Sequence, residues 1–349
     1  TQQSSTRTVH TLQIRLPPLP SIKDVIRLYK LRALRELSQN FLMEPRLIDK
    51  IVNAAGNIEN HIVCEVGPGP GGITRSIIQR APRKLILVEK DRRFLPSLEL
   101  VADACRDKVD VDIISGDILK TNIAHYIPDD VKTDWLDQPP PVHLIGNLPF
   151  SVSTILIIRW LEMMSKQEGP WAFGRARMTL TFQKEVAERM AARILHKQRC
   201  RLSVMCQNWC TVRYKFDISG ASFLPKPDVD VGVVTLTPLK HPIIKKPFKM
   251  VEKVVRQIFG MRQKYSIRGA QTLFPEDVRT EMALRMYKLA DIDPVTRPFQ
   301  IANQEFARLV DAYAEIIKQY PELENYDYRA QKKKKLTETD PEAEKQIEN

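Results

Sequence analysis

Short apolar runs alternate with stretches of helical spacing over residues 41–238. Five such runs, most of them rich in Val, Ile and Leu, are typical of strands. They are residues 61–66, 84–89, 109–114, 142–146 and 177–183. Between them the apolar spacing predicts helices over 45–55, 73–79 and 153–164. Strands that alternate with helices predict a doubly wound, mostly parallel α/β sheet.

Beyond the last predicted strands, apolar residues recur at helical spacing only. They do so over 248–259 and again over 306–317, which predicts amphipathic helices within a small all-helical domain over 239–330. Residues 331–349 hold as many bases as acids and show no periodicity. We therefore expect a disordered charged tail there.

The first 36 residues differ in composition from the rest of the chain. Ser, Thr, Gln and scattered Arg and Lys precede the first acidic residue, Asp24. This composition is typical of a mitochondrial transit peptide or its remnant, and a merely disordered leader is the alternative. Ser21 lies three residues before Asp24 and apolar residues follow, a pattern that predicts the cap of an N-terminal helix.

Positive charge is concentrated in two parts of the chain. The sequence holds 54 Lys and Arg against 42 Asp and Glu, a formal net charge of +12. Residues 240–270 carry nine bases and one acid, and residues 184–215 carry eight bases and two acids. Such clusters are the electrostatic footprint of a polyanion such as nucleic acid, and an ordinary solvated surface is the alternative.

Several classes of protein do not fit the sequence. The five cysteines form no CxxC pair, so neither a disulfide framework nor a zinc site of paired thiolates is indicated, and we expect no metal. No run of about 18 apolar residues occurs, so we expect no membrane-spanning helix. Hydrophobic residues make up 43% of the chain, which is too many for a disordered protein.

A glycine-rich loop, EVGPGPGG at 65–72, follows one predicted strand and precedes a predicted helix. Glycines at such a junction let the backbone approach a ligand at the carboxyl edge of the sheet. The loop also satisfies the G-x-G-x-x-G fingerprint, so by itself it leaves both NAD and S-adenosylmethionine open. Glu89 and Asp117 follow the next two strands, where one carboxylate can accept both ribose hydroxyls of an adenosine-bearing cofactor and the other an adenine amine.

The tetrapeptide Asn147-Leu148-Pro149-Phe150 ends the fourth predicted strand. The Asn147 side-chain carbonyl and the Leu148 main-chain carbonyl can accept the two hydrogens of an exocyclic amine, and Phe150 can stack on the ring that carries it. A nicotinamide enzyme would need a nearby proton donor such as His or Lys, and none is indicated. The turn therefore favours a nucleobase amine over hydride transfer.

Together with QNFL at 39–42, EKD at 89–91, FQKEVAER at 182–189 and PKPDVD at 225–230, these motifs resemble the small-subunit rRNA adenine dimethyltransferases. The likeness runs in order from about residue 37 to beyond 297. The basic leader, a Pro- and Asp-rich stretch at 128–141 that we expect to be a loop, and the charged tail are more typical of the mitochondrial branch, the mitochondrial transcription factor B family, than of the bacterial one.

The resemblance implies a Rossmann-like class I methyltransferase domain over 37–238 that uses S-adenosylmethionine. The implied cofactor-binding residues are Gln39, Asn40, Leu42, Gly67, Gly69, Glu89, Lys90, Asp117 and Asn147. The implied catalytic residues, which would hold the target base, are Asn147, Leu148, Pro149 and Phe150. The candidate RNA-binding residues of the helical domain are Lys249, Lys253, Arg256, Arg262 and Lys264. The sequence departs from the family pattern at Val231, Gln263 and Phe299. These departures leave the expected methyl-transfer site intact but affect the rRNA contacts expected of the C-terminal domain.

The implied function is dimethylation of the exocyclic amines of two adjacent adenines in a hairpin loop near the 3′ end of mitochondrial small-subunit rRNA, in support of subunit assembly. The implied protein is a monomer of the mitochondrial matrix whose partner is this rRNA or the assembling small subunit. The alternative is a nucleic-acid-binding transcription factor on the same fold that works with the mitochondrial transcription machinery without methyl transfer. The intact glycine loop, Glu89, Asp117 and the turn at 147–150 favour the enzyme, because binding DNA requires none of them.

Overall fold

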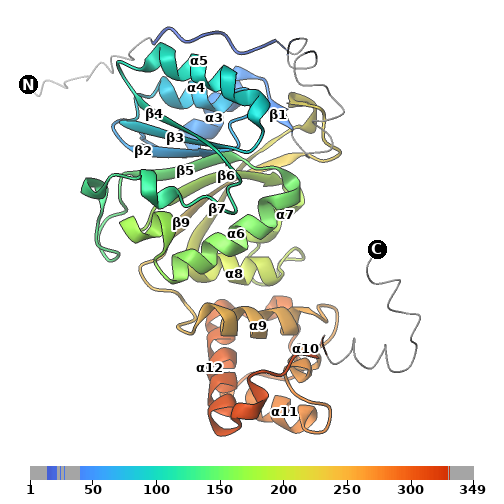
Figure 1. Cartoon of the computed structure of the whole chain (residues 1–349). Helices are drawn as coiled ribbons and strands as arrows, with labels where there is room; N and C mark the ends of the chain where they lie inside the picture. The colour runs from blue at the N-terminus through green and yellow to red at the C-terminus, as the bar shows by residue number, and fades with distance from the viewer. Residues whose placement is uncertain (1–13, 22–23, 25–26, 28–39, 329, 331–349) are drawn as a thin grey trace, which may run out of the picture. The chain divides into compact units, whose positions relative to one another are not determined.

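The computed structural model describes residues 14–21, 24, 27, 40–328 and 330, which form two compact units (Figure 1). The first unit contains the described residues up to Ala191 together with Trp209–Lys240. The second contains Ala192–Asn208 and the described residues from His241 onward. Residues 192–208, which precede the last strands of the first unit, therefore belong with the helices that follow those strands. Within the described residues, no helix is long and apolar enough to cross a bilayer.

A seven-stranded sheet in the order β4-β3-β2-β5-β6-β9-β7 forms the centre of the first unit. The five strands from β4 to β6 in this order are parallel, whereas β9 runs antiparallel to β6 and β7. The strands are β2 (Ile62–Val66), β3 (Lys84–Glu89), β4 (Asp110–Ser115), β5 (Val142–Asn147), β6 (Arg177–Gln183), β7 (Cys210–Ile218) and β9 (Val231–Pro238). All five predicted strands are confirmed to within one residue. Four of them are buried along most of their length, which produces the apolar runs seen in the sequence, whereas β4 at the edge of the sheet is half-buried or exposed.

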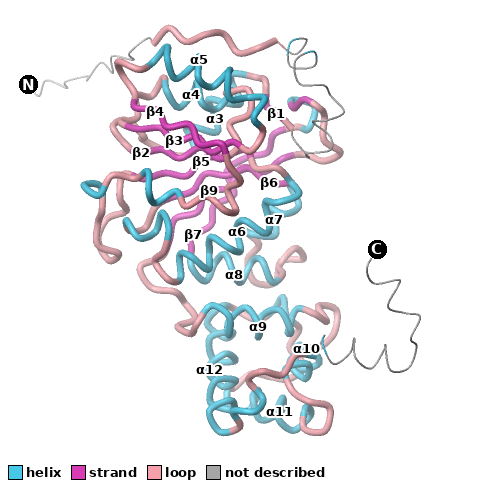
Figure 2. The backbone as a smooth tube through the Cα atoms, viewed as in Figure 1, coloured by secondary structure: helices cyan, strands magenta, loops and turns pink. Residues whose placement is uncertain are grey.

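Helices cover both faces of this sheet (Figure 2). They are α3 (Pro45–Ala54), α4 (Gly72–Ile78), α5 (Leu95–Cys105), α6 (Phe150–Ser165) and α7 (Lys184–Ala191). The helices α3, α4 and α5 lie on one face and α6 on the other, as a doubly wound fold requires. The three predicted helices are confirmed, and α6 begins three residues early because Pro149 at its N-cap already has the φ that a helix start needs. The expected loop at 128–141 contains one short 3₁₀ turn, Asp129–Val131.

Residues 14–20, here called the N-terminal strap, lie against α4 and belong to the core of the first unit. Ile14 is buried, and its main-chain carbonyl accepts a hydrogen bond from the Gln79 side chain over 2.7 Å. Arg75 donates from Nε to the carbonyl of Pro17 over 2.9 Å. Part of the predicted leader is thus a structural element, while its residues 1–13 and most of the predicted N-terminal helix lie outside the described residues.

The predicted helix cap at Ser21 is confirmed. The Ser21 main-chain N–H and hydroxyl both donate to the Asp24 carboxylate, over 3.1 and 2.6 Å. In return, the Asp24 main-chain N–H donates to the Ser21 hydroxyl over 3.2 Å. This reciprocal arrangement is a capping box, and the described residues Asp24 and Arg27 are helical.

The second unit is helical, as the apolar spacing predicts. Its helices are α8 (Arg201–Trp209), which leads the chain back into the first unit, α9 (Phe248–Phe259), α10 (Ser266–Ala270), α11 (Arg279–Ala290) and α12 (Asn303–Gln319). The predicted helices over 248–259 and 306–317 correspond to α9 and α12 and are confirmed. Aromatic rings fill the core, where the Phe274 and Tyr313 centroids lie 5.9 Å apart. The predicted charged tail, 331–349, lies outside the described residues.

Candidate functional site

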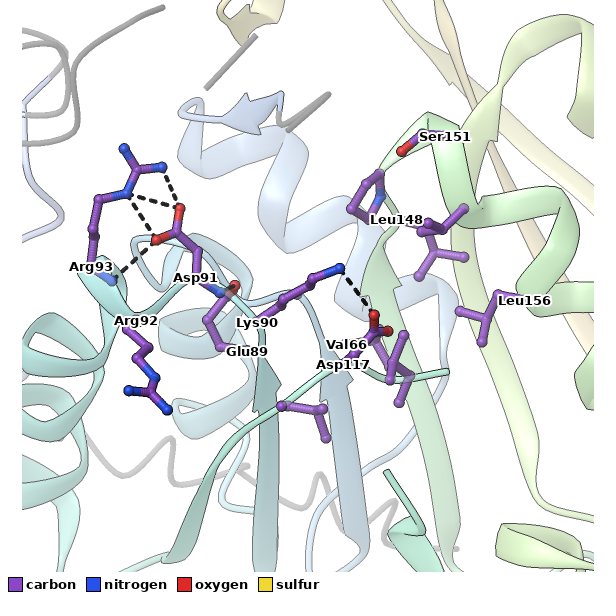
Figure 3. A pocket seen from close by; sticks show the side chains of 16 residues that line it. Val66, Glu89, Lys90, Asp91, Arg92, Arg93, Asp117, Leu148, Ser151 and Leu156 are labelled. Carbon is purple, nitrogen blue, oxygen red and sulfur yellow. Dashed lines mark hydrogen bonds and ion pairs between the residues drawn. The ribbon is translucent and has the colours of Figure 1, made fainter. Parts of the chain in front are cut away.

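A cavity of about 600 Å³ lies at the carboxyl ends of β2, β3, β4 and β5 (Figure 3). Residues 66–67, 88–93, 116–118, 148–149, 151–152 and 156 line it. A smaller cavity of about 40 Å³ adjoins the same turns and is lined by Asn40, Phe41, Gly67, Glu89 and 147–150. Open α/β sheets bind ligands in the crevice at this edge. The sequence motifs therefore converge where the fold is expected to bind a ligand.

The glycines of the loop at 65–72 have different tasks. Gly67 has φ +65°, a left-handed conformation that favours glycine, and it lines both cavities. Gly69 has φ +54° and lines neither of them. A Cβ built on Gly69 would lie 2.5 Å from Cε1 of Phe41, so the space above this residue is filled by an aromatic ring. Gly69 therefore makes room for Phe41 and donates its N–H to Glu89, rather than opening the backbone to a ligand.

Glu89 ends β3 as a buried carboxylate that lines both cavities. Its Oε2 accepts from the Gly69 N–H over 2.9 Å, and its Oε1 accepts from the Asp91 N–H over 2.7 Å. Burial raises its pKa above the usual value despite these hydrogen bonds. A carboxylate offers about four acceptor positions, so Glu89 is fixed by two donors and retains capacity for a ligand.

A second buried carboxylate, Glu65, lies beneath the glycine loop at the end of β2. The Thr74 hydroxyl donates to its Oε2 over 2.6 Å. Burial raises the pKa of Glu65 to about 8, and the nearby Glu89 charge adds to this. Glu65 is therefore mostly protonated at neutral pH, which avoids two buried negative charges behind one loop.

Asp117 lies on the opposite wall of the cavity. Its Oδ1 accepts from the Leu119 N–H over 2.9 Å, and its Oδ2 lies 3.0 Å from the Lys90 ammonium. The Leu119 hydrogen bond and the Lys90 charge hold the pKa of Asp117 below its usual value, so it is an anion at neutral pH. In Figure 3, Lys90 extends towards Asp117, whereas Arg92 points away from this pair.

Asn147 is the last residue of β5, and its amide is fixed at both ends. Its Nδ2 donates to the main-chain carbonyl of Asn40 over 2.7 Å, and its Oδ1 accepts from the Thr181 hydroxyl over 2.6 Å. Leu148 and Pro149 line both cavities, and Phe150, the first residue of α6, lines the smaller one. The whole predicted turn at 147–150 thus lies at the cavities.

The structure brings most of the predicted site residues together. Those that line one or both cavities are Asn40, Gly67, Glu89, Lys90, Asp117, Asn147, Leu148, Pro149 and Phe150. Gln39 lies outside the described residues, and Leu42 is buried in the hydrophobic core. Sequence reasoning did not assign roles to Phe41, Thr74 or Thr181. The sequence does not single out Thr181, because β6 also contains Arg177, Thr179 and Gln183.

Asn40 reaches the site through a short pairing at the edge of the first unit. The strand β1 (Phe41–Leu42) runs antiparallel to β8 (Phe223–Leu224). The Phe41 ring packs edge-on against Phe94, with centroids 5.1 Å apart. This packing fixes the main chain that presents the Asn40 carbonyl to Asn147.

The candidate RNA-binding residues of the second unit differ in their surroundings. Lys249 and Lys264 are exposed, and Arg256 and Arg262 are half-buried. The Lys253 ammonium donates to the main-chain carbonyl of Glu324 over 2.6 Å and lies 5.7 Å from the Tyr313 ring centroid. Burial lowers the pKa of Lys253. Lys253 is therefore bound within its own unit and half-buried, whereas Lys249 and Lys264 are exposed.

Comparisons with known proteins point to one family. The chain matches the family model for ribosomal RNA adenine dimethylases over residues 31–314. Human mitochondrial dimethyladenosine transferase 1 is 51% identical over 335 residues, which cover 96% of each chain. The Drosophila pseudoobscura protein of the same name is 53% identical over 322 residues, covering 91% of this chain and 93% of its own.

Solved structures agree in fold. A dimethyladenosine transferase from Plasmodium falciparum superimposes with a TM-score of 0.59 at 21% identity and covers 79% of this chain and 98% of its own. The 23S rRNA methyltransferase ErmE superimposes with a TM-score of 0.53 at 19% identity and covers 78% of this chain and 98% of its own. The predicted class I methyltransferase fold is thereby confirmed. From the matched model and the identity over nearly the whole length, the chain belongs to the ribosomal RNA adenine dimethylase family.

Proposed function

We propose that this rRNA adenine dimethyltransferase uses S-adenosylmethionine to dimethylate the exocyclic amines of two adjacent adenines in a hairpin loop near the 3′ end of mitochondrial small-subunit rRNA. The family and the names of its relatives support adenine dimethylation. The observation that carries the proposal is that the turn at 147–150 faces the same edge of the sheet as Glu89 and Asp117. One site can therefore hold an adenosine-bearing cofactor and a second, reacting base.

The residues of the larger cavity fit S-adenosylmethionine. The volume of this cavity, about 600 Å³, lies within the range of roughly 300–1,000 Å³ that small-molecule sites occupy. Gly67 has no side chain to obstruct the approach, Glu89 has acceptor capacity for ribose hydroxyls, and Asp117 is an anionic acceptor for an adenine amine. Asn40 and Lys90, on the cavity walls, are the further proposed contacts.

The chain's own residues then have to present the target amine correctly. S-adenosylmethionine, when bound, supplies a methyl group that its sulfonium charge has already activated, so alignment is the main requirement. The Asn147 Oδ1 has a second lone pair beyond the one that Thr181 uses, and it can accept one amine hydrogen. The Leu148 carbonyl is the proposed acceptor for the other. Acceptors in this arrangement favour the tetrahedral nitrogen of the transition state without a strong general base.

Phe150 is proposed to contact the ring of the target base, and the second unit is proposed to contact the RNA backbone. The Phe150 ring, at the smaller cavity, would stack on the target base after the base leaves its own stack. Removing the target base from its stack costs a few kcal/mol, and this cost is smaller in a hairpin loop than in a duplex. Exposed Lys249 and Lys264 would contact phosphates, which position the RNA without reading its sequence.

The cellular setting is proposed from the relatives, which are named mitochondrial. We place the protein in the mitochondrial matrix as a monomer that acts on the small-subunit rRNA or the assembling subunit. A transcription factor that contacts the mitochondrial transcription machinery remains the second candidate, because clustered positive charge suits DNA as well as RNA. The buried carboxylates at the cavity favour the enzyme.

Primer extension across the small-subunit rRNA tests the function. After incubation with protein and S-adenosylmethionine, reverse transcription should stop at two adjacent adenines, because a dimethylated amine has no hydrogen left for base pairing. The matched control is the Asn147→Ala variant, which should give far fewer stops. Full-length extension with folded, cofactor-binding wild-type protein would contradict the proposed activity. Stabilisation by NAD instead of S-adenosylmethionine in thermal melts would contradict the proposed cofactor.

A further inference from the structure

Two groups outside the turn at 147–150 hold the amide of Asn147. The Asn40 carbonyl accepts from Nδ2 over 2.7 Å, and the Thr181 hydroxyl donates to Oδ1 over 2.6 Å. Asn40 immediately precedes β1, whereas Thr181 lies in the middle of the sheet on β6. Three elements that are distant in sequence therefore converge on one side-chain amide.

Thr181 reaches Asn147 through the register of the sheet. The strands β5 and β6 are parallel neighbours, and Asn147 is paired with Thr181 in that register. Thr181 is fully buried, at 0% exposure, between apolar neighbours in its strand. A buried hydroxyl without a partner would cost about 1–3 kcal/mol, so its hydrogen bond to Asn147 accounts for a polar residue at this place.

The direction of the Asn147 amide matters for the chemistry. The terminal torsion of an asparagine is broad, so the amide can rotate end for end unless its partners prevent it. A rotated amide would present N–H donors to a target amine that itself carries hydrogens, and the two cannot bond in that way. The Asn40 carbonyl fixes the nitrogen end and the Thr181 hydroxyl fixes the oxygen end, so the acceptor remains an acceptor.

We propose that Thr181 is a positioning residue for methyl transfer, acting through Asn147. This inference rests on the proposed function, because it assumes that Asn147 Oδ1 accepts from the target amine. Thr181 lines neither cavity, so it does not contact the cofactor or the base there. Its hydroxyl restrains the oxygen that does. Loss of the hydroxyl should therefore lower the rate of methyl transfer and leave the binding of both substrates unchanged.

The Thr181→Val variant tests the proposal, because valine keeps the shape and removes the donor. With RNA and S-adenosylmethionine saturating, its single-turnover rate should fall about tenfold, with both dissociation constants within about twofold of the wild type. Thr181→Ser keeps a hydroxyl and should restore most of the rate. Thr179→Val is the matched control, since Thr179 is buried on the same face of β6 two residues earlier and pairs with Ile145 instead.

A double-mutant comparison shows whether Thr181 acts through Asn147. In an Asn147→Ala background, Thr181→Val should have no further effect on the rate, because its partner is already absent. A full additional tenfold loss in that background would overturn the proposed route. So would a wild-type rate in Thr181→Val alone.

A second readout is independent of activity. In protein labelled with ¹⁵N-asparagine, the Asn147 side-chain NH₂ signal is identified by its loss in Asn147→Ala. It should shift and broaden in Thr181→Val and stay in place in Thr179→Val. An unmoved signal would overturn the restraint whatever the activity. If instead the signal moves but wild-type protein transfers no methyl group, the proposed function fails while the restraint holds.

Discussion

Replacing Gly69 with alanine should destabilise the first unit, and the structure indicates by how much. At φ +54°, an alanine costs about 1–2 kcal/mol in backbone strain. Its Cβ would lie 2.5 Å from Cε1 and 2.7 Å from Cδ1 of Phe41, so the ring must move. Moving it disrupts the edge-on contact with Phe94, worth about 0.5–1.5 kcal/mol. The expected loss is therefore about 1.5–3.5 kcal/mol of unfolding free energy.

Two other glycines serve as controls because each isolates one part of this cost. Gly56 has φ +85° with nothing within 4 Å of a Cβ, so Gly56→Ala measures backbone strain alone. Gly67 has φ +65°, and a Cβ on it would lie 3.9 Å from the main-chain carbonyl oxygen of Asn147, which is an ordinary van der Waals contact. Gly67→Ala should therefore be strained to a similar degree but should mainly weaken cofactor binding, because Gly67 lines both cavities.

Calorimetry measures both effects. Differential scanning should place the Tm of Gly69→Ala several degrees below that of Gly56→Ala, since each kcal/mol lowers the Tm of a domain this large by about 2–4 °C. Titration with S-adenosylmethionine should show weaker binding by Gly69→Ala as well, because the strained loop displaces the main-chain N–H of residue 69 that holds Glu89. Equal Tm values for Gly69→Ala and Gly56→Ala would refute the role assigned to Phe41.

Three further predictions concern other parts of the molecule. Asn147→Ala should lower the single-turnover methylation rate roughly 100-fold, as loss of a preorganised polar contact does elsewhere, with RNA affinity in binding assays almost unchanged because phosphate contacts dominate it. Lys249→Gln should weaken RNA binding and reduce by about one the slope of log affinity against log salt concentration. Lys253→Gln should instead lower the Tm of the second unit and leave that slope unchanged, because the Lys253 ammonium is bound to the Glu324 carbonyl. Equal slopes for the two variants would contradict these different roles. Burial lowers the pKa of His143 from 6.5 to about 3, so the unfolded chain binds a proton at this residue more tightly than the folded chain does. The unfolding free energy, measured by urea titration, should therefore fall as the pH falls from about 6.5 towards 3. His143→Gln should make the unfolding free energy less dependent on pH in this range.

The fold was largely predictable from the sequence because burial leaves a simple pattern. Strands such as β3, buried along nearly its whole length, are apolar runs that any periodicity analysis detects. The helix α5 was not predicted, since only Leu98, Val101 and Cys105 of its eleven residues are buried. The edge strand β7 alternates exposed and half-buried positions between its buried ends, and its bases Arg213 and Lys215 were counted as part of a charge cluster instead.

Charge patterns were a weaker guide, because a sequence does not show which cations are satisfied inside the fold. Arg199 belongs to the basic cluster at 184–215, yet it is 2% exposed and donates to the Ile301 carbonyl and to Asn303 Oδ1. Lys253 is the second example. The carboxylates and the turn at 147–150 were predictable for the opposite reason, since parallel strands end at one edge and bring such residues together.

The N-terminal strap sets a limit on how far the N-terminus can be shortened without damage to the first unit. A chain shortened beyond Pro17 would lose the buried Ile14 side chain, the Ile14 carbonyl that accepts from Gln79 and the Pro17 carbonyl that accepts from Arg75. Arg75 also donates to the carbonyls of Pro70 and Gly71, which belong to the glycine loop at the cofactor cavity. Loss of the strap would therefore also loosen the glycine loop, because Arg75 links the two segments.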